Sequence, residues 1–264
     1  MYFGLSEDQI FFLDNVKKFL EDQLTLDTVK KITEGEDDLA KEELHKGLIN
    51  LGINNILVPE EYGGLGLDLL FATAVSQSLG EGVATLPFLG PYILAPTAIK
   101  YGASDSQKEK LFADMSQNLI NFGIGFSEYF GSRDSSGLNI SDNKVTGKTL
   151  FVLDTDFASH VMIADNKGQI GIVSLDSNDI EMIDLTTVDK TRTYKEMHFS
   201  DTPIEILDKT KSSSFAIEMA LDAGRIIAAA DSLGASQAMI NKAVEYSKER
   251  KQFNRVIGSF QAVK

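Results

Sequence analysis

The sequence predicts an α+β protein with several domains: an N-terminal helical bundle, a central antiparallel β-barrel or sandwich, and the start of a C-terminal helical bundle. Three observations support this fold class. Apolar residues recur at helical spacing through residues 1–119, and short β-branched and aromatic runs separated by turn residues fill 120–210. Helical spacing then returns over 211–264. We expect these three ranges to form the domains.

The first range begins with a strong helix signal. Ser6 and Gln9 have the spacing of a capping box, and an apolar stripe follows as far as Leu24. Further helices are expected over about residues 39–51, 68–79, 91–100 and 105–115. The first of these ends at Gly52, because glycine readily adopts the left-handed conformation that closes a helix.

The middle range has the pattern of short strands. We expect them at Ile120–Phe126, Asn139–Ser141, Lys144–Val152, His160–Ala164, Ile170–Leu175, Ile180–Leu185 and Thr193–Phe199. Turn residues at this spacing are typical of an antiparallel barrel or sandwich. Parallel βαβ units are excluded because helical crossover segments are missing. A Rossmann nucleotide site is not supported, since no Gly-x-Gly-x-x-Gly lies between a strand and a helix.

The last range predicts one very long helix. Apolar residues spaced by threes and fours run from Phe215 to about Gln252, far beyond the average of about 11–12 residues. Such a helix usually belongs to a bundle or an oligomer interface. A turn at Phe253-Asn254 and a second helix from Ser259 should follow. One helical turn is too short to be stable alone, so we expect either more chain after Lys264 or a second chain packed against it.

Composition excludes several functions. The chain has 25 basic and 39 acidic residues, a net charge of −14, which disfavours binding to nucleic acid or anionic lipid. No apolar run is long enough for a membrane span. Without cysteine there is no disulfide, no thiolate nucleophile and no cysteine-based zinc site, as expected for a cytoplasmic protein. His45, His160 and His198 lie in unrelated segments, so we expect surface or strand residues rather than metal ligands.

Four motifs carry a family resemblance. They are the loop Pro59–Gly66, then Asp222-x-x-Arg225 with Gly234 and Gln237, then Arg250–Phe253, and finally Phe260–Val263. In this order and spacing they resemble the acyl-CoA dehydrogenase family, whose domains also follow the order helical, β, helical. The resemblance covers nearly the whole chain. The segments 147–154 and 189–192 are similar to a divergent, shorter branch, several members of which are one of two unlike subunits.

The resemblance implies FAD-dependent α,β-dehydrogenation of an acyl-CoA thioester. In that reaction a carboxylate removes the α-proton while the β-hydride passes to the flavin. It also implies an oligomer, either homomeric or heteromeric, with electron-transfer flavoprotein as electron acceptor. The cofactor-binding residues that it implies are Phe126, Ser127, Arg133, Phe151, Leu153, Arg250, Phe253 and Gln261. The substrate-binding residues are Asp222 and Arg225.

The central cofactor residues depart from the family pattern. Ser127 keeps a hydroxyl next to the flavin, but Tyr129 replaces the family's proline. Arg133 replaces a small hydroxyl residue; it either binds the pyrophosphate in bidentate fashion or is a solvated loop arginine. Phe151 can still stack on the ring, whereas Leu153 has lost a hydroxyl. Alternatively, these two residues are one face of a barrel strand.

The residues on the long helix also have alternative interpretations. Arg250 and Gln261 resemble residues that reach the adenine and pyrophosphate end of FAD bound to a neighbouring subunit. Arg250 could instead be a helix-end charge that interacts with the helix dipole, and Phe253 is expected to pack at the turn. Asp222 and Arg225 either bind substrate or form an exposed ion pair within the helix.

No residue of this sequence matches the catalytic base of the family. In most of the family it is a glutamate in the C-terminal third, which we expect beyond Lys264. In one branch it immediately precedes the arginine matched by Arg225, and here that residue is Gly224. Three hypotheses follow: a flavoenzyme whose base lies outside this sequence, a non-catalytic partner subunit, or a scaffold without flavin. The chain as given is not expected to turn over alone.

Overall fold

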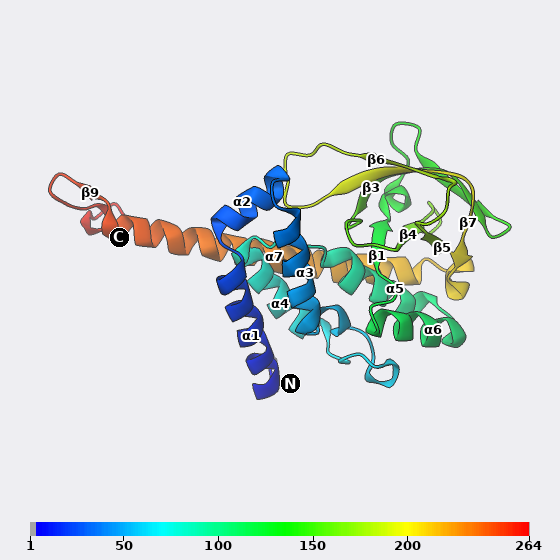
Figure 1. The fold of residues 1–264 in the computed structure, drawn as a ribbon, viewed down its shortest axis with the longest axis horizontal. Coiled ribbons are helices and arrows are strands. Elements are labelled where there is room, and N and C mark those ends of the chain that lie inside the picture. The colour runs from blue at the N-terminus through cyan, green and yellow to red at the C-terminus, as the bar shows by residue number, and fades with distance from the viewer. Residues whose placement is uncertain (1–3, 264) are drawn as a thin grey trace.

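The structure is a computed structural model that describes residues 4–263. Helices lie together on one side and a β-sheet on the other, and one long helix, α7, runs past both and projects away from them (Figure 1). The helices are α1 Glu7–Gln23, α2 Leu26–Glu34, α3 Asp38–Asn50, α4 Leu69–Gly82, α5 Ala95–Gly102, α6 Asp105–Ser116 and α7 Phe215–Glu249. This confirms the predicted fold class of helical, β and helical parts.

Short helical turns connect these elements. They are η1 Ile53–Asn55, η2 Glu60–Tyr62, η3 Gly90–Leu94, η4 Ser127–Phe130, η5 Asp208–Lys211 and η6 Ile257–Ser259. The predicted capping box is present, because Ser6 Oγ accepts from the Gln9 N–H and Gln9 Oε1 accepts from the Ser6 N–H. The helix predicted near 91–100 instead begins as the π-helical turn η3, with Pro91 in its first turn. Helix α2, capped by Thr25, was not predicted.

The sheet is antiparallel except at one pair. Its strands are β1 Phe122–Gly125, β2 Gly137–Ser141, β3 Lys144–Leu153, β4 His160–Ala164, β5 Ile170–Ser174, β6 Ile180–Asp184, β7 Tyr194–Pro203 and β8 Glu205–Ile206. The order is β6-β7-β3-β1-β4-β5-β8, and β2 pairs with β3. Strands β1 and β4 are parallel, with Phe122 opposite His160. The β2–β3 hairpin, rather than a helix, separates them along the chain, which explains why this parallel pair was missed.

The end of the chain differs from the prediction. The turn at Phe253-Asn254 is confirmed: both residues have positive φ, and they join strands β9 Lys251–Gln252 and β10 Arg255–Val256 into a hairpin. The helix expected from Ser259 is absent, because the described residues up to Val263 form only η6 and a turn. A segment of this length makes too few hydrogen bonds to offset the cost of nucleation.

Helix α7 packs against both the helical part and the sheet. Its buried residues are Ala216, Ile217, Ala220, Ala223, Gly224, Ile227, Ala230 and Gly234, all in its first twenty residues. Its contact with α4 is unusually close. A Cβ on Gly80 would lie 2.0 Å from the Asp231 carbonyl oxygen, and a Cβ on Gly234 would lie 1.9 Å from the Gln77 carbonyl oxygen. Glycine at both places therefore fixes the separation of the two helices.

Candidate functional site

The first part of the candidate site is the contact between η4 and strand β3. Ser127 is the first residue of η4, directly after β1, and its hydroxyl donates to the Leu150 carbonyl oxygen at 2.5 Å. Ser127 therefore contacts β3 at Leu150, next in sequence to Phe151. Phe126 precedes it and is buried in the core between the sheet and the helices.

A buried carboxylate that was not predicted fixes η4. Glu128 is buried, and its Oε2 accepts a 2.6 Å hydrogen bond from the Ser136 hydroxyl. Its Oε1 accepts from the Leu150 N–H at 3.2 Å and from the Ser127 hydroxyl at 3.2 Å. A buried carboxylate requires such partners. In the sequence, Glu128 lies between Ser127 and Tyr129 in the cofactor motif, and we interpreted only those two neighbours.

Phe151 is presented by an irregularity in β3. The pairing with β7 shifts register between Thr149 and Val152, and Phe151 there has a φ of 55°. A positive φ is unfavourable for an aromatic residue and is concentrated at functional sites. The Phe151 side chain is 43% exposed, so its ring is available for stacking on a planar group.

Leu153 lines a cavity of about 210 Å³ between the sheet and the helices. The cavity lies between the end of β3, the start of β7, α4 and α7. Its walls are mostly apolar, formed by Leu79, Ala84, Leu86, Phe88, Leu89, Leu153, Ile227 and Ala228. Polar side chains come from Ser76, Arg192, Tyr194, Asp231 and Ser232. Arg192 and Asp231 form an ion pair with 3.3 Å between Nη2 and Oδ1, which joins the segment before β7 to α7.

The packing around Gly224 leaves little room for a catalytic base at that position of α7. Gly224 is buried, and a Cβ there would lie 2.7 Å from Leu94 Cδ2 and 3.7 Å from Leu89 Cδ1. Since Leu89 lines the 210 Å³ cavity, position 224 faces the side of α7 on which the cavity lies. A longer side chain at 224 would have to displace Leu94.

Asp222 and Arg225 form an exposed ion pair within α7, the alternative to substrate binding that the sequence left open. Arg225 Nη1 contacts Asp222 Oδ1, and both side chains are exposed. Asp222 lines a second cavity of about 240 Å³, between α7, α5 and the loop before α4. Arg225 lies on the same helical stripe as Glu218, which accepts a 3.1 Å hydrogen bond from the Tyr129 hydroxyl. Tyr129, which replaces the family's proline, therefore connects η4 to this face of α7.

Three predicted cofactor residues lie far from this site. Arg250 stacks on the Tyr246 ring, with 5.4 Å from its guanidinium carbon to the ring centroid. Phe253 is 89% exposed, its ring centroid is 6.4 Å from that of Phe260, and Gln261 is the next residue in sequence. The segment from β9 to the C-terminus lies at the projecting end of α7 (Figure 1). At 1.5 Å per residue, Arg250 is about 38 Å along the helix from Arg225. One chain therefore does not bring these residues to Ser127 and Phe151.

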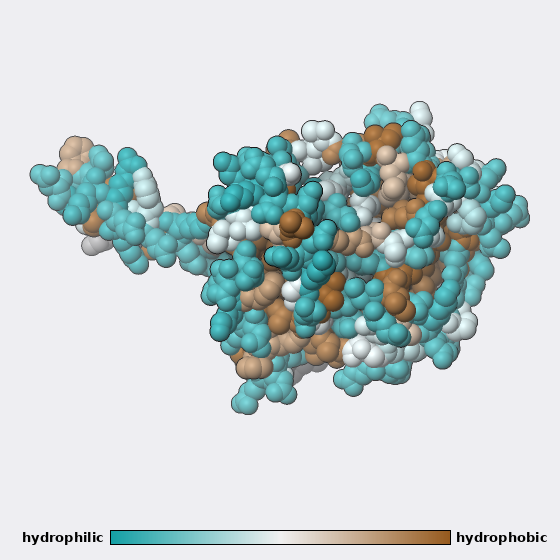
Figure 2. All heavy atoms as spheres, in the orientation of Figure 1, coloured by the Kyte–Doolittle hydropathy of each residue, from teal (hydrophilic) through white to brown (hydrophobic). Residues whose placement is uncertain are grey.

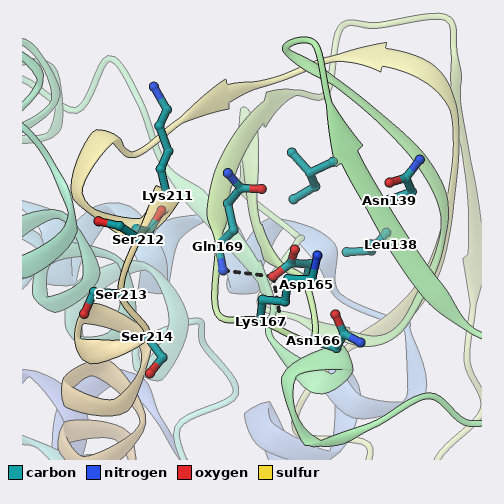
Figure 3. Close-up of a pocket in the computed structure, with 12 residues that line it drawn as sticks. Leu138, Asn139, Asp165, Asn166, Lys167, Gln169, Lys211, Ser212, Ser213 and Ser214 are labelled. Atoms are coloured by element: carbon teal, nitrogen blue, oxygen red, sulfur yellow. Dashed lines mark hydrogen bonds between the residues drawn. The ribbon is translucent and has the colours of Figure 1, made fainter.

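Arg133 and the largest hollow give no further site residues. Arg133 is exposed, and its backbone is held by Ser136: its N–H donates to Ser136 Oγ at 2.9 Å, and its carbonyl oxygen accepts from the Ser136 N–H at 2.7 Å. The largest hollow, about 670 Å³, lies where β2, the β4–β5 turn and the start of α7 meet (Figure 3). Its lining is largely polar, and Asp165 there accepts from the N–H groups of Lys167 and Gln169. None of the predicted site residues lines it.

Two of the three histidines match the prediction and one does not. His160 and His198 lie in strands β4 and β7. His45 is instead buried in α3, stacked on Phe157 at 3.9 Å and 3.1 Å from the Tyr92 hydroxyl. Burial lowers the pKa of His45 to about 4. Among residues 4–263 no three His, Asp or Glu side chains are grouped closely enough to hold a metal ion.

Comparison with known proteins identifies the family. The family model described as "Acyl-CoA dehydrogenase, N-terminal domain" matches residues 6–118, and the model for the C-terminal domain matches residues 215–264. The chain belongs to the acyl-CoA dehydrogenase family. Among curated relatives, a 3-(aryl)acrylate reductase of Clostridium sporogenes is 28% identical over 246 residues, covering 84% of this chain and 64% of that protein.

Solved structures of the family share the fold. The butyryl-CoA dehydrogenase of Megasphaera elsdenii superposes with a TM-score of 0.82 at 23% identity, covering all of this chain and 74% of that one. The ChsE4–ChsE5 complex from Mycobacterium tuberculosis gives a TM-score of 0.78 at 21% identity, covering 99% of this chain and 72% of that one. Within residues 4–263, no helix of this family member has the length and apolarity to cross a membrane.

The residues present fit the ring end of a flavin. Phe151 is exposed and has a positive φ, the carbonyl of the preceding Leu150 accepts from the Ser127 hydroxyl, and Leu153, two residues further along β3, lines the cavity. A planar, largely apolar ring requires such a surface. The residues that would hold the dinucleotide end, Arg250 and Gln261, lie at the other end of α7 and would have to come from another copy.

Proposed function

We propose that this protein binds FAD and an acyl-CoA thioester and forms part of an acyl-CoA dehydrogenase-type oxidoreductase. When bound, FAD supplies the two-electron chemistry at the α,β-bond, in the direction of either dehydrogenation or reduction. The observation that supports the proposal is the hydrogen bond from the Ser127 hydroxyl to the Leu150 carbonyl oxygen of β3, the strand that also carries the exposed Phe151 ring and the cavity-lining Leu153.

Different residues of the chain are assigned to the flavin ring and to the substrate. Phe151 supplies a stacking surface and Ser127 a hydroxyl for the ring. The 210 Å³ cavity beyond Leu153 takes the acyl chain, because its apolar walls exclude water. We assign Asp222 and Arg225 to the CoA portion, so their ion pair rearranges when substrate binds. Because the pair is exposed, breaking it costs only a few tenths of a kcal/mol.

The one carboxylate that α7 contributes to the lining of this cavity, Asp231, is already paired with Arg192, and we do not assign it as the proton acceptor. Position 224 faces the cavity and is glycine, which has no group that could remove a proton. We propose that the acid comes from sequence or from a subunit outside residues 1–264. Phe253, Arg250 and Gln261 are assigned to the cofactor of a second copy, and electron-transfer flavoprotein to the role of acceptor.

A second candidate function is that of a non-catalytic subunit in a heteromeric enzyme. Gly224 favours it, because the base position of one branch is empty. The ChsE4–ChsE5 complex has the same fold and is made of two unlike chains. In this case the chain binds a catalytic partner, and its own cavity need not be productive.

Flavin binding is tested by titrating purified protein with FAD and following the quenching of flavin fluorescence. We expect saturable binding that Arg250→Ala weakens much more than Arg133→Ala, since Arg133 is exposed and its side chain has no role in the fold. Protein that takes up no FAD would refute the proposal. The reverse order of the two variants would show that Arg250 is misassigned. An acid supplied by the reading frame after Lys264 would favour the first function over the second.

A further inference from the structure

The free polar group of the 210 Å³ cavity is the hydroxyl of Tyr194. Tyr194 is the first residue of β7, and its side chain is half-buried in the cavity lining. The hydroxyl makes no hydrogen bond with any of residues 4–263, and it is not one of the unpaired atoms that the protein encloses completely. A ligand in the cavity can therefore reach it.

The other polar groups of the cavity already have partners. The hydroxyls of Ser76 and Ser232 each donate at 2.9 Å to a carbonyl oxygen of α7. Arg192 and Asp231 form an ion pair with each other. A ligand with a polar atom therefore gains a hydrogen bond from Tyr194 without breaking one that the protein already makes.

Tyr194 stands opposite a residue that the family resemblance assigns to the cofactor. In the antiparallel pairing of β3 with β7, Tyr194 is the direct partner of Leu153. Such partners project to the same face of a sheet, with Cβ atoms about 4.5–5.5 Å apart. Both line the cavity, so together they form its sheet wall, whereas α4, α7 and the loop between α4 and η3 form the helical wall. Leu153 has no polar atom in its side chain, and the hydroxyl beside it belongs to the neighbouring strand.

The two ligands of the proposed function differ in what they offer this hydroxyl. A hydrocarbon acyl chain has no acceptor and would leave the hydroxyl without a partner. The isoalloxazine ring has carbonyl oxygens and ring nitrogens along one edge, and these accept hydrogen bonds. Burial raises the pKa of Tyr194, so the hydroxyl keeps its proton at neutral pH and can donate it to such an acceptor.

We propose that Tyr194 is a cofactor-binding residue, whose hydroxyl donates a hydrogen bond to the polar edge of the flavin ring from the strand next to Leu153. This inference rests on the proposed function, since it requires FAD at the sheet wall of the cavity. The reduced ring is richer in electrons and accepts such a bond more strongly than the oxidised ring. Tyr194 therefore influences both the affinity for FAD and the midpoint potential of the bound flavin.

The test uses Tyr194→Phe, which keeps the aromatic ring and removes only the hydroxyl. The protein is expressed with whatever its reading frame carries after Lys264 and is titrated with FAD, followed by quenching of flavin fluorescence. We expect FAD to bind about tenfold more weakly, because an acceptor of the bound ring loses its partner. The midpoint potential, measured by reductive titration against a reference dye, should become more negative.

The matched control removes a tyrosine hydroxyl elsewhere in the fold. Tyr62 stacks on Phe112 with 5.5 Å between ring centroids and does not line the cavity. Tyr62→Phe should leave both the FAD affinity and the midpoint potential unchanged. A loss in this variant equal to that in Tyr194→Phe would overturn the inference.

A double variant separates hydrogen bonding from a structural role. Leu153→Thr in the Tyr194→Phe background returns a hydroxyl to the same wall of the cavity, so part of the lost affinity should be recovered. If Tyr194→Phe weakens FAD binding at an unchanged midpoint potential and the double variant recovers nothing, Tyr194 only supports the fold and the inference is wrong. Thermal unfolding of each variant shows whether its fold is intact.

The remaining outcomes distinguish this inference from the proposed function. If wild-type protein binds FAD and Tyr194→Phe has the same affinity and potential, the inference is overturned and FAD binding stands. Wild-type protein that binds no FAD would overturn both.

Discussion

The α4–α7 contact gives the sharpest test of how this site is held. Gly234→Ala adds one methyl group where a Cβ would lie 1.9 Å from the Gln77 carbonyl oxygen and 2.9 Å from the Glu81 nitrogen. Both are backbone atoms, so no side-chain rotation relieves the clash. Real Cβ contacts are essentially never shorter than 3.0 Å, so the helices must separate by about 1 Å.

Two opposing effects set the size of the change. Overpacking of this kind costs about 1–3 kcal/mol, and the upper part of the range applies because backbone must move. Separation also strains the hydrogen bond from the buried Ser76 hydroxyl to the Ile227 carbonyl oxygen. Alanine has a better helix propensity than glycine by about 1 kcal/mol, which offsets part of the cost. We expect a net loss of about 2 kcal/mol, or about 4–8 °C in Tm for a protein of this size.

The matched control is Gly82→Ala in α4. A Cβ on Gly82 would lie 3.4 Å from Leu24 Cδ2, an ordinary contact with a flexible side chain. This variant should therefore be neutral or more stable by up to about 1 kcal/mol. Circular dichroism during thermal and urea unfolding measures both. If Gly234→Ala is as stable as Gly82→Ala, the close approach of α4 and α7 is not a feature of the protein in solution.

Three further predictions concern buried titratable groups. Burial raises the pKa of Asp154 to about 6, because the protonated carboxyl is favoured in the folded state. This contribution to stability is fully present below the ordinary pKa of aspartate and is lost as pH rises through 6. Asp154→Asn should therefore increase the unfolding free energy at pH 7 by up to about 3 kcal/mol, measured by urea unfolding. The lowered pKa of His45 acts with the opposite sign, since stability is lost as pH falls from 6.5 toward 4. His45→Gln removes this loss, so the unfolding free energy of the variant relative to wild type should rise as pH falls from 6.5 toward 4, and an equal pH dependence of the two proteins would contradict the assignment. Glu128→Gln places an amide among three donors and should cost about 1–3 kcal/mol, with weaker FAD binding as η4 loosens; unchanged FAD affinity would exclude a positioning role.

Local patterns predicted most of the elements, because the residues that decide them are neighbours in sequence. The capping box at Ser6, the long apolar repeat of α7 and the turn at Phe253-Asn254 all depend on spacings of a few residues. Helix α2 was missed because nine residues carry too little of a periodic signal. The parallel pairing of β1 with β4 was missed because strand order depends on packing between residues far apart in the chain.

The candidate site was predictable only in part, for the same reason. The motif resemblance singled out Ser127 as a residue next to a flavin, and the structure shows its hydroxyl bonded to the Leu150 carbonyl oxygen of β3; its role at a flavin stays a prediction. The cavity could not be predicted, since its walls come from α4, β3, β7 and α7, separated by up to about 150 residues. Arg192 illustrates this: the sequence marks it only as part of a segment similar to one branch of the family, and only the fold shows its ion pair with Asp231 of α7 and its place in the lining of this cavity.

The geometry of α7 explains why the two groups of predicted cofactor residues differ so much in their surroundings. The buried residues of α7 all lie in its first twenty, where the helix packs against α4 and α5, and this packing fixes the positions of Gly224 and Arg225. Its last turns expose apolar side chains, Met239, Ile240 and Val244, and then Arg250. A cofactor held between Phe151 and Arg250 therefore cannot be held by one chain, because the two ends are separated by rigid helix. In our proposal the fold described here supplies the Phe151 end of the cofactor site, whereas the Arg250 end serves a cofactor shared with a second chain.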